Sequence, residues 1–186
     1  ADCVTATGTD ETLSAVRRQL RHPVRFLGYG HRVSFGYITN EVLSGFQAPQ
    51  VAARAAADIA AWNQLGCLSP QAFYVEHGGR TTAEQFAEML AAELAKLEAL
   101  EPRGPVPPEV AAAIANRRLF YEVRAAHSSE TRCWFSYQST AWSVIYEADP
   151  QFQVSCLHRF VYVKGARDLT EVLQAAVGNH FRDKLQ

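Results

Sequence analysis

The sequence predicts an α/β fold with a mostly parallel sheet, flanking helices and some antiparallel strands. Short β-like runs alternate with helix-like segments through the first 100 residues, as in βαβ units. A later aromatic-rich stretch reads as two strands joined by a polar turn, which indicates an antiparallel pair. With 48% apolar and 20% charged residues, the 186-residue chain has the composition of a globular domain that buries a core.

The expected strands are short runs rich in β-branched and aromatic residues, separated by glycine and proline. In chain order they cover residues 3–7, 24–27, 32–38, 72–75, the two halves of 132–147, and 158–165. Residues 28–31, "GYGH", are predicted as a turn, and a second turn is expected near residues 138–140.

Helices are expected where apolar residues recur at intervals of three and four. The longest follows a cap at Thr81 or Thr82 and has Phe86, Leu90 and Leu94 on one face. The predicted helices cover residues 8–20, 50–63, 83–100, 109–122 and 168–177, and a proline-rich stretch, 101–108, joins two of them.

Charge and hydropathy exclude several classes of partner. The formal net charge of −1 does not favour nucleic acid or an acidic membrane surface. No apolar run approaches the roughly 20 residues needed to span a bilayer. The N-terminus has neither a signal peptide's features nor a Met, so we expect a mature or excised segment of a longer chain.

Four cysteines are far apart in the sequence, and their spacing with histidine predicts no metal site. In a domain of this size we expect reduced thiols and therefore a cytoplasmic protein. Cys3, Cys133 and Cys156 lie in apolar or β-like surroundings and are predicted to be buried core residues.

Cys67 differs, because it lies between a helix-like and a strand-like segment in "AAWNQLGCLSPQAFYVE". A tight loop there can expose the thiol and direct backbone N–H groups at an oxyanion. Gly66 permits close approach of a ligand, and Pro70 stiffens the loop. Residue type alone leaves an inert, buried Cys67 open as the alternative.

The pattern W-N-Q-x-x-C-x-S-P resembles the nucleophile segment of the acyl-CoA reductase family, which includes the fatty-acid reductase component of bacterial bioluminescence. That family belongs to the aldehyde dehydrogenase superfamily. The segments "VTATGTDETL", "RFLGYGHRVSFGYI" and "LHRFVYVKGARDLTEVLQ" resemble further parts of the family in the same order. The resemblance implies an aldehyde-dehydrogenase-like catalytic domain over residues 41–186, after a remnant of the cofactor-binding domain and a linker over residues 1–40.

The resemblance also implies a reaction. The Cys67 thiolate attacks acyl-CoA or an acyl-protein, and NADPH (or NADH) reduces the resulting thioester through a thiohemiacetal to a fatty aldehyde. The implied residues are Asn63, Gln64 and Ser69 for oxyanion and loop support, and Gly8, Thr9, Gly28 and Gly30 for the cofactor. The residues alone leave two alternatives open: Asn63 and Gln64 as no more than a cap of the preceding helix, and Gly8 and Thr9 as a plain cap of the first helix. A homo-oligomer and a protein that donates acyl groups are both left open as partners.

Two departures qualify the resemblance. The segment "FLGYG" lacks the glutamate with which hydrolytic aldehyde dehydrogenases activate water, which favours acyl-CoA reduction. Val33 stands where G-x-G-x-x-G needs its last glycine, so there is no dinucleotide fingerprint and the chain alone is not expected to be active. The alternatives are a thiol acyltransferase or thioesterase, which needs a histidine base near Cys67, and a non-catalytic interaction domain.

Overall fold

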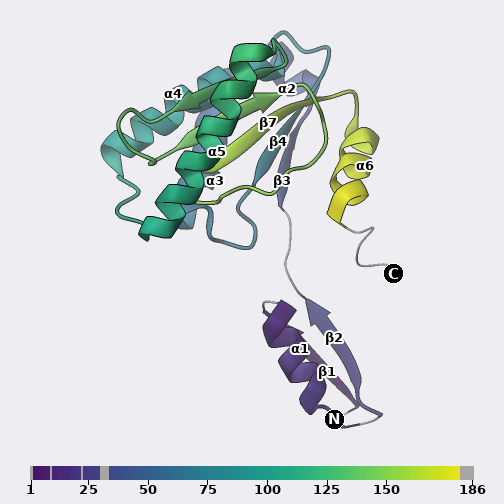
Figure 1. Ribbon diagram of the computed structural model, residues 1–186. Helices are drawn as coiled ribbons and strands as arrows, with labels where there is room; N and C mark the ends of the chain where they lie inside the picture. Colours follow the sequence, from purple (N-terminus) through teal and green to yellow (C-terminus); the bar gives the residue numbers. More distant parts are fainter. Residues whose placement is uncertain (1, 9, 22, 30–33, 181–186) are drawn as a thin grey trace. The chain divides into compact units, whose positions relative to one another are not determined.

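The computed structural model describes residues 2–8, 10–21, 23–29 and 34–180, with side chains as far as residue 176 (Figure 1). The chain forms two compact units, Ala1–Val33 and Ser34–Gln186. Their boundary falls inside the segment 1–40 that was expected to hold the cofactor-domain remnant and a linker.

The smaller unit contains β1 (Cys3–Thr7), α1 (Asp10–Gln19) and β2 (Arg25–Tyr29), and its two strands pair in parallel. Asp10 and Glu11 lie in the first turn of α1 and two arginines in the last, which complements the helix dipole. The turn predicted from residue 28 is wrong there, because Gly28 lies within β2. A Cβ at Gly28 would lie 2.9 Å from the ring of Phe26, so packing explains this glycine.

The larger unit is built on a five-stranded sheet of order β3-β4-β7-β6-β5. Neighbouring strands are parallel except β5 and β6, which confirms the predicted mostly parallel sheet with an antiparallel pair. Its elements are β3 (Phe35–Ile38), α2 (Asn40–Ser44), α3 (Ala48–Ala60), η1 (Ala61–Gln64), β4 (Ala72–Glu76), α4 (Ala83–Leu100), α5 (Pro108–His127), β5 (Thr131–Phe135), β6 (Ser143–Glu147), β7 (Phe160–Ala166) and α6 (Leu169–His180).

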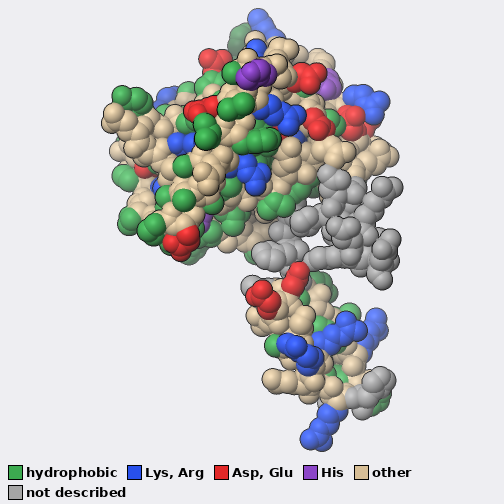
Figure 2. Space-filling view, in the orientation of Figure 1, with side chains coloured by type: hydrophobic (Ala, Val, Ile, Leu, Met, Phe, Trp, Pro, Cys, Tyr) green, Lys and Arg blue, Asp and Glu red, His purple; other side chains and the backbone are tan. Residues whose placement is uncertain are grey.

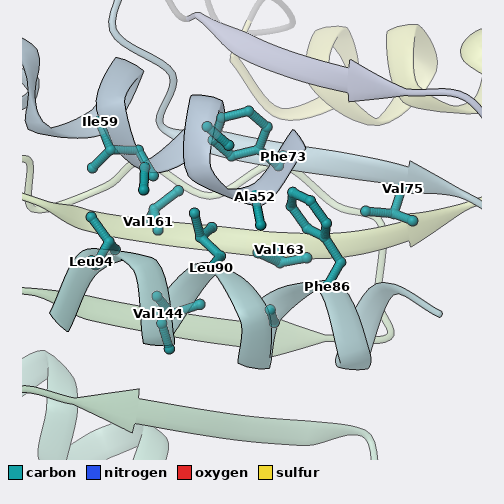
Figure 3. Close-up of a cluster of buried hydrophobic side chains, with 14 of the residues drawn as sticks. Ala52, Ile59, Phe73, Val75, Phe86, Leu90, Leu94, Val144, Val161 and Val163 are labelled. Carbon is teal, nitrogen blue, oxygen red and sulfur yellow. The ribbon is translucent and has the colours of Figure 1, made fainter. Parts of the chain in front are cut away.

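The main core lies between one face of this sheet and helices α3 and α4 (Figure 3). Alternate strand residues point into it, among them Phe73, Val144 and Val163. The predicted apolar face of α4 is confirmed, since its Phe86 and Leu90 are fully buried there. This packing fixes β4, and therefore the loop that leads into it.

The opposite face of the sheet packs against α5 and carries polar groups. The rings of Tyr121 on α5 and Tyr162 on β7 meet with centroids 5.8 Å apart. Lys164 is fully buried, and its Nζ lies 3.3 Å from a carboxylate oxygen of the buried Glu147. Burial lowers the pKa of Lys164, while the Glu147 carboxylate opposes that shift.

Charges of both signs are interspersed on the face of the molecule drawn in Figure 2, in keeping with the near-neutral net charge. Within the described ranges, no helix is both long enough and apolar enough to cross a membrane.

Replacing Thr82 with alanine should lower the free energy of unfolding by about 1 kcal/mol, because Thr82 caps α4. Its Oγ1 accepts a hydrogen bond from the Gln85 N–H at 3.2 Å, and the Gln85 Oε1 accepts one from the Thr82 N–H at 3.0 Å. Urea unfolding measures the loss. Thr81→Ala, one residue outside the cap, is the matched control, and equal midpoints for the two variants would contradict the capping role.

Candidate active site

Cys67 lies on an exposed β-turn between η1 and β4. The turn is closed by a hydrogen bond of 3.0 Å from the Ser69 N–H to the Gly66 carbonyl, which places Cys67 and Leu68 at its two central positions. Leu68 is 80% exposed. The chain therefore presents the thiol at a bend rather than inside the core.

The segment that leads into this turn is strained. Trp62, Asn63 and Gln64 have φ angles of 53°, 51° and 64°, a left-handed conformation that is unfavourable for residues other than glycine. The prediction of a helix through residue 63 is therefore wrong at its end, because α3 stops at Ala60 and the chain reverses its twist. Runs of this kind persist only where their surroundings hold them, and they concentrate at functional sites.

Two amide side chains hold the strained segment. Gln64 is 1% exposed; its Nε2 donates to the Pro70 carbonyl at 2.8 Å, and its Oε1 accepts from the Phe160 N–H at 3.0 Å. Asn63 donates from Nδ2 to the Arg103 carbonyl at 3.1 Å. Asn63 and Gln64 precede the Cys67 turn in the chain. Their hydrogen bonds tie this segment to Arg103, after α4, and to Phe160, at the start of β7.

Ser34 joins the turn to the start of β3. Its Oγ donates to the Cys67 carbonyl at 2.8 Å, and its own carbonyl accepts from the Gln71 N–H at 2.8 Å. The sequence pattern predicted no role for Ser34, although Ser34 belongs to the segment "RFLGYGHRVSFGYI" that carries part of the family resemblance. Two segments that carry the family resemblance therefore meet at the thiol.

An open cavity of about 490 Å³ adjoins the thiol. Its lining is mainly apolar and comes from β3, the end of α3, the Cys67 turn and β4. The lining residues are Phe35, Gly36, Asp58, Ala61, Trp62, Gly66, Cys67, Leu68, Ser69, Pro70 and Phe73. The space suits an apolar chain attached near the sulfur.

Backbone donors are available at the turn. Within the part of the chain that the structure describes, the N–H groups of Cys67 and Leu68 have no acceptor. Ser69 lines the cavity, and its hydrogen bond within the turn is made by its main chain rather than by its hydroxyl. Two adjacent, unbonded N–H groups beside a thiol are suited to receive an oxyanion.

The other three thiols lie in different surroundings. Cys133 and Cys156 are half-buried, and burial raises the pKa of both, which disfavours the thiolate. The prediction that Cys3 is a buried core residue is wrong, because Cys3 is exposed on β1 of the smaller unit. Its short two-stranded sheet does not cover that position. Among the described residues, no group of three or more His, Cys, Asp and Glu side chains is placed to hold a metal.

The four predicted cofactor residues, Gly8, Thr9, Gly28 and Gly30, fall within the residue range of the smaller unit. Thr9 and Gly30 are outside the described residues. The Gly8 N–H donates to the Tyr29 carbonyl at 3.2 Å, and the first turn of α1 carries two carboxylates, which disfavours a phosphate there. Cofactor binding by these residues therefore stays a prediction.

Gly36→Ala should cost about 1–3 kcal/mol of unfolding free energy, because the new methyl group overpacks the cavity floor. A Cβ at position 36 would lie 2.4 Å from the ring of Phe73. Urea unfolding compares it with Gly45→Ala, whose Cβ would meet nothing within 4 Å. Equal stabilities for the two variants would show that the Phe73 ring is not fixed.

Comparison with known proteins identifies the family and the fold. A family model for acyl-CoA reductase (LuxC) matches residues 1–186. No curated protein matches the chain. A variant of proline utilization A from Bradyrhizobium japonicum is 17% identical with a TM-score of 0.65, and the alignment covers 94% of this chain and 18% of that one.

Two aldehyde dehydrogenases share the fold. The NAD-dependent benzaldehyde dehydrogenase from Corynebacterium glutamicum is 12% identical with a TM-score of 0.61, over 94% of this chain and 39% of that one. An indole-3-acetaldehyde dehydrogenase complexed with NAD+ is 15% identical with a TM-score of 0.61, over 95% and 38%. The chain thus spans less than two-fifths of these relatives. The predicted aldehyde-dehydrogenase-like fold and family resemblance are confirmed, and the chain belongs to the acyl-CoA reductase (LuxC) family.

Proposed function

We propose that this chain carries the nucleophile of an enzyme that reduces fatty acyl-CoA to aldehyde with NADPH or NADH, through a thioester on Cys67. Family membership supports the overall reaction. The observation that carries the assignment is the exposed Cys67 thiol on a turn with two unbonded N–H groups, at the wall of an apolar cavity.

In the first half of the reaction, the Cys67 thiolate attacks the acyl carbonyl carbon. The C–S bond to coenzyme A breaks, coenzyme A leaves as a thiolate, and the acyl group remains as a thioester on Cys67. The N–H groups of Cys67 and Leu68 donate to the carbonyl oxygen while it carries negative charge. Trp62 and Phe73 offer the acyl chain apolar contacts.

A nicotinamide cofactor, when bound, supplies the hydride that takes the thioester to the aldehyde. The NAD+ complex of an aldehyde dehydrogenase that shares the fold supports this class of cofactor, and NADPH rather than NADH stays a prediction. From this chain we derive only the acyl transfer and the recovery of the Cys67 thiolate when the aldehyde leaves, and cofactor binding by Gly8, Thr9, Gly28 and Gly30 stays a prediction. The division at residue 40, the cytoplasmic location, the acyl-protein substrate and the oligomeric or acyl-donor partner also stay predictions.

The acyltransferase or thioesterase alternative has less support. It needs a histidine base beside the thiol, and no described histidine lines the cavity. An interaction domain with an inert thiol also fits less well, because Cys67 is exposed rather than buried.

Steady-state turnover of palmitoyl-CoA by the complete protein separates these functions. A reductase consumes one NADPH or NADH for each coenzyme A released and each aldehyde formed. Release of coenzyme A with no consumption of reduced nicotinamide would identify a transferase or thioesterase instead. No release of coenzyme A at all would favour the interaction domain.

A further inference from the structure

The strained run beside the nucleophile has a counterpart at the start of β7. Leu157, His158 and Arg159 have φ angles of 59°, 54° and 66°. Of the seven non-glycine residues with positive φ in the described ranges, six form these two runs, 62–64 and 157–159. Two unfavourable runs of three residues are therefore present in the larger unit, and each needs partners that hold it.

The two runs hold each other. The Arg159 Nε donates to Asn63 Oδ1 at 3.1 Å, and the Phe160 N–H donates to Gln64 Oε1 at 3.0 Å. These hydrogen bonds join residues 96 positions apart in the sequence. Asn63 and Gln64 lead directly into the Cys67 turn. A shift of Arg159 would therefore move Asn63 and, through it, the turn that carries the thiol.

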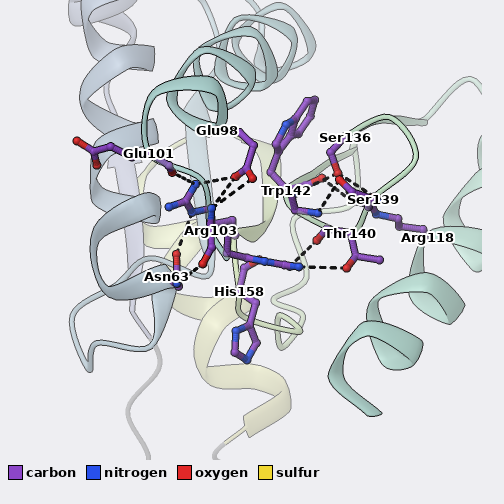
Figure 4. Close-up of polar contacts among 12 residues, drawn as sticks. Asn63, Glu98, Glu101, Arg103, Arg118, Ser136, Ser139, Thr140, Trp142 and His158 are labelled. Carbon is purple, nitrogen blue, oxygen red and sulfur yellow. Dashed lines mark hydrogen bonds and ion pairs between the residues drawn. The ribbon is translucent and has the colours of Figure 1, made fainter. Parts of the chain in front are cut away.

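Arg159 is itself fixed on its other side. It is 4% exposed, and its Nη1 donates to Glu98 Oε2 at 2.9 Å and to the Glu101 carbonyl at 3.0 Å. The Glu98 carboxylate also accepts from the Arg103 N–H, and the Arg103 carbonyl accepts from Asn63. Figure 4 shows Asn63, Glu98 and Arg103 converging at this point. The planar guanidinium thus bridges Asn63 and the end of α4.

We propose that Arg159 is a positioning residue for the nucleophile: it holds Asn63 in the left-handed conformation and thereby fixes the turn that carries Cys67. The inference rests on the proposed function, in which Cys67 is acylated. Arg159 does not line the cavity and acts only through Asn63. A lysine keeps the charge but offers a single nitrogen, whereas Arg159 uses two, Nε for Asn63 and Nη1 for Glu98 and Glu101.

Arg159→Lys in the complete protein tests this with two measurements. We expect Cys67 to be acylated by palmitoyl-CoA more slowly by a factor on the order of ten to a hundred, because a displaced nucleophile loses alignment. We also expect faster hydrogen exchange at the Leu65 and Ser69 amides, whose bonds to Trp62 and Gly66 close the loop. The double variant with Asn63→Ala should lose no more than either single variant, within a factor of about two.

Arg118→Lys is the matched control, because Arg118 is also buried and makes several hydrogen bonds. Its partners are Ser136, Ser139, Trp142 and Ser143, and Figure 4 shows it apart from Asn63. We expect the folded Arg118→Lys protein to keep the parent's acylation rate and loop exchange. Asn63→Ala alone removes the same contact and gives the same two measurements if Arg159→Lys does not fold.

Unchanged exchange at Leu65 and Ser69, or losses that multiply in the double variant, would overturn the positioning role. A parent protein that is never acylated would overturn the proposed function instead. In that case hydrogen exchange, which needs no substrate, still decides whether Arg159 positions the turn.

Discussion

Cys67→Ala should lower turnover of acyl-CoA by about 10⁴-fold or more, because it removes the atom to which the acyl group is transferred. The side chain is exposed, so its loss leaves the core intact, and the urea midpoint should match the parent's. Release of coenzyme A and consumption of NADPH or NADH should both stop, since reduction follows acylation.

Cys3→Ala is the control for this substitution, because Cys3 is also exposed but lies in the smaller unit. We expect it to keep the parent's activity. Turnover by Cys67→Ala within about tenfold of the parent would contradict the assignment, because removing a covalent nucleophile costs far more than that.

Phe86→Ala should lower the free energy of unfolding by about 3–5 kcal/mol, the largest stability effect we expect from a single substitution in the main core. Phe86 is fully buried between α4 and the sheet, and its ring centroid lies 6.3 Å from that of Phe73, which lines the floor of the cavity. The loss is a large share of the 5–15 kcal/mol that holds a typical domain. Urea unfolding followed by circular dichroism measures it.

The same substitution at an exposed phenylalanine is the control. Phe46 is 92% exposed, so Phe46→Ala should change stability by no more than about 0.5 kcal/mol. Equal losses from the two variants would show that Phe86 is not buried as the structure places it.

The sequence pattern predicted correctly those helices and strands whose structure depends on residues close together in the chain. The apolar spacing of Phe86, Leu90 and Leu94 and a cap at Thr81 or Thr82 predicted α4, which begins at Ala83 as expected and is capped by Thr82. The aromatic stretch predicted the antiparallel pair β5–β6. In each case, residues close in the sequence make the contacts that decide the structure.

The site depends on contacts that local patterns do not contain. Residues 61–63 continue a helical composition, yet Arg159 and Phe160 hold Asn63 and Gln64 in a left-handed run. The pairing of Ser34 with Cys67 likewise joins residues 33 positions apart. The resemblance pointed to Cys67 and to loop support by Asn63 and Gln64, but their long-range partners Arg159 and Phe160 became visible only in three dimensions.

Direct mapping of the acylated residue tests the central claim, that Cys67 carries the acyl group. The complete protein is mixed with deuterated palmitoyl-CoA without NADPH or NADH, quenched in acid and digested with trypsin. The tryptic peptide 55–80 contains Cys67 as its only cysteine. We expect the palmitoyl mass on this peptide, close to one per chain, and its removal by neutral hydroxylamine, which cleaves thioesters and spares an ester on Ser69. Label on a different peptide, or turnover to aldehyde with no label on Cys67, would contradict it.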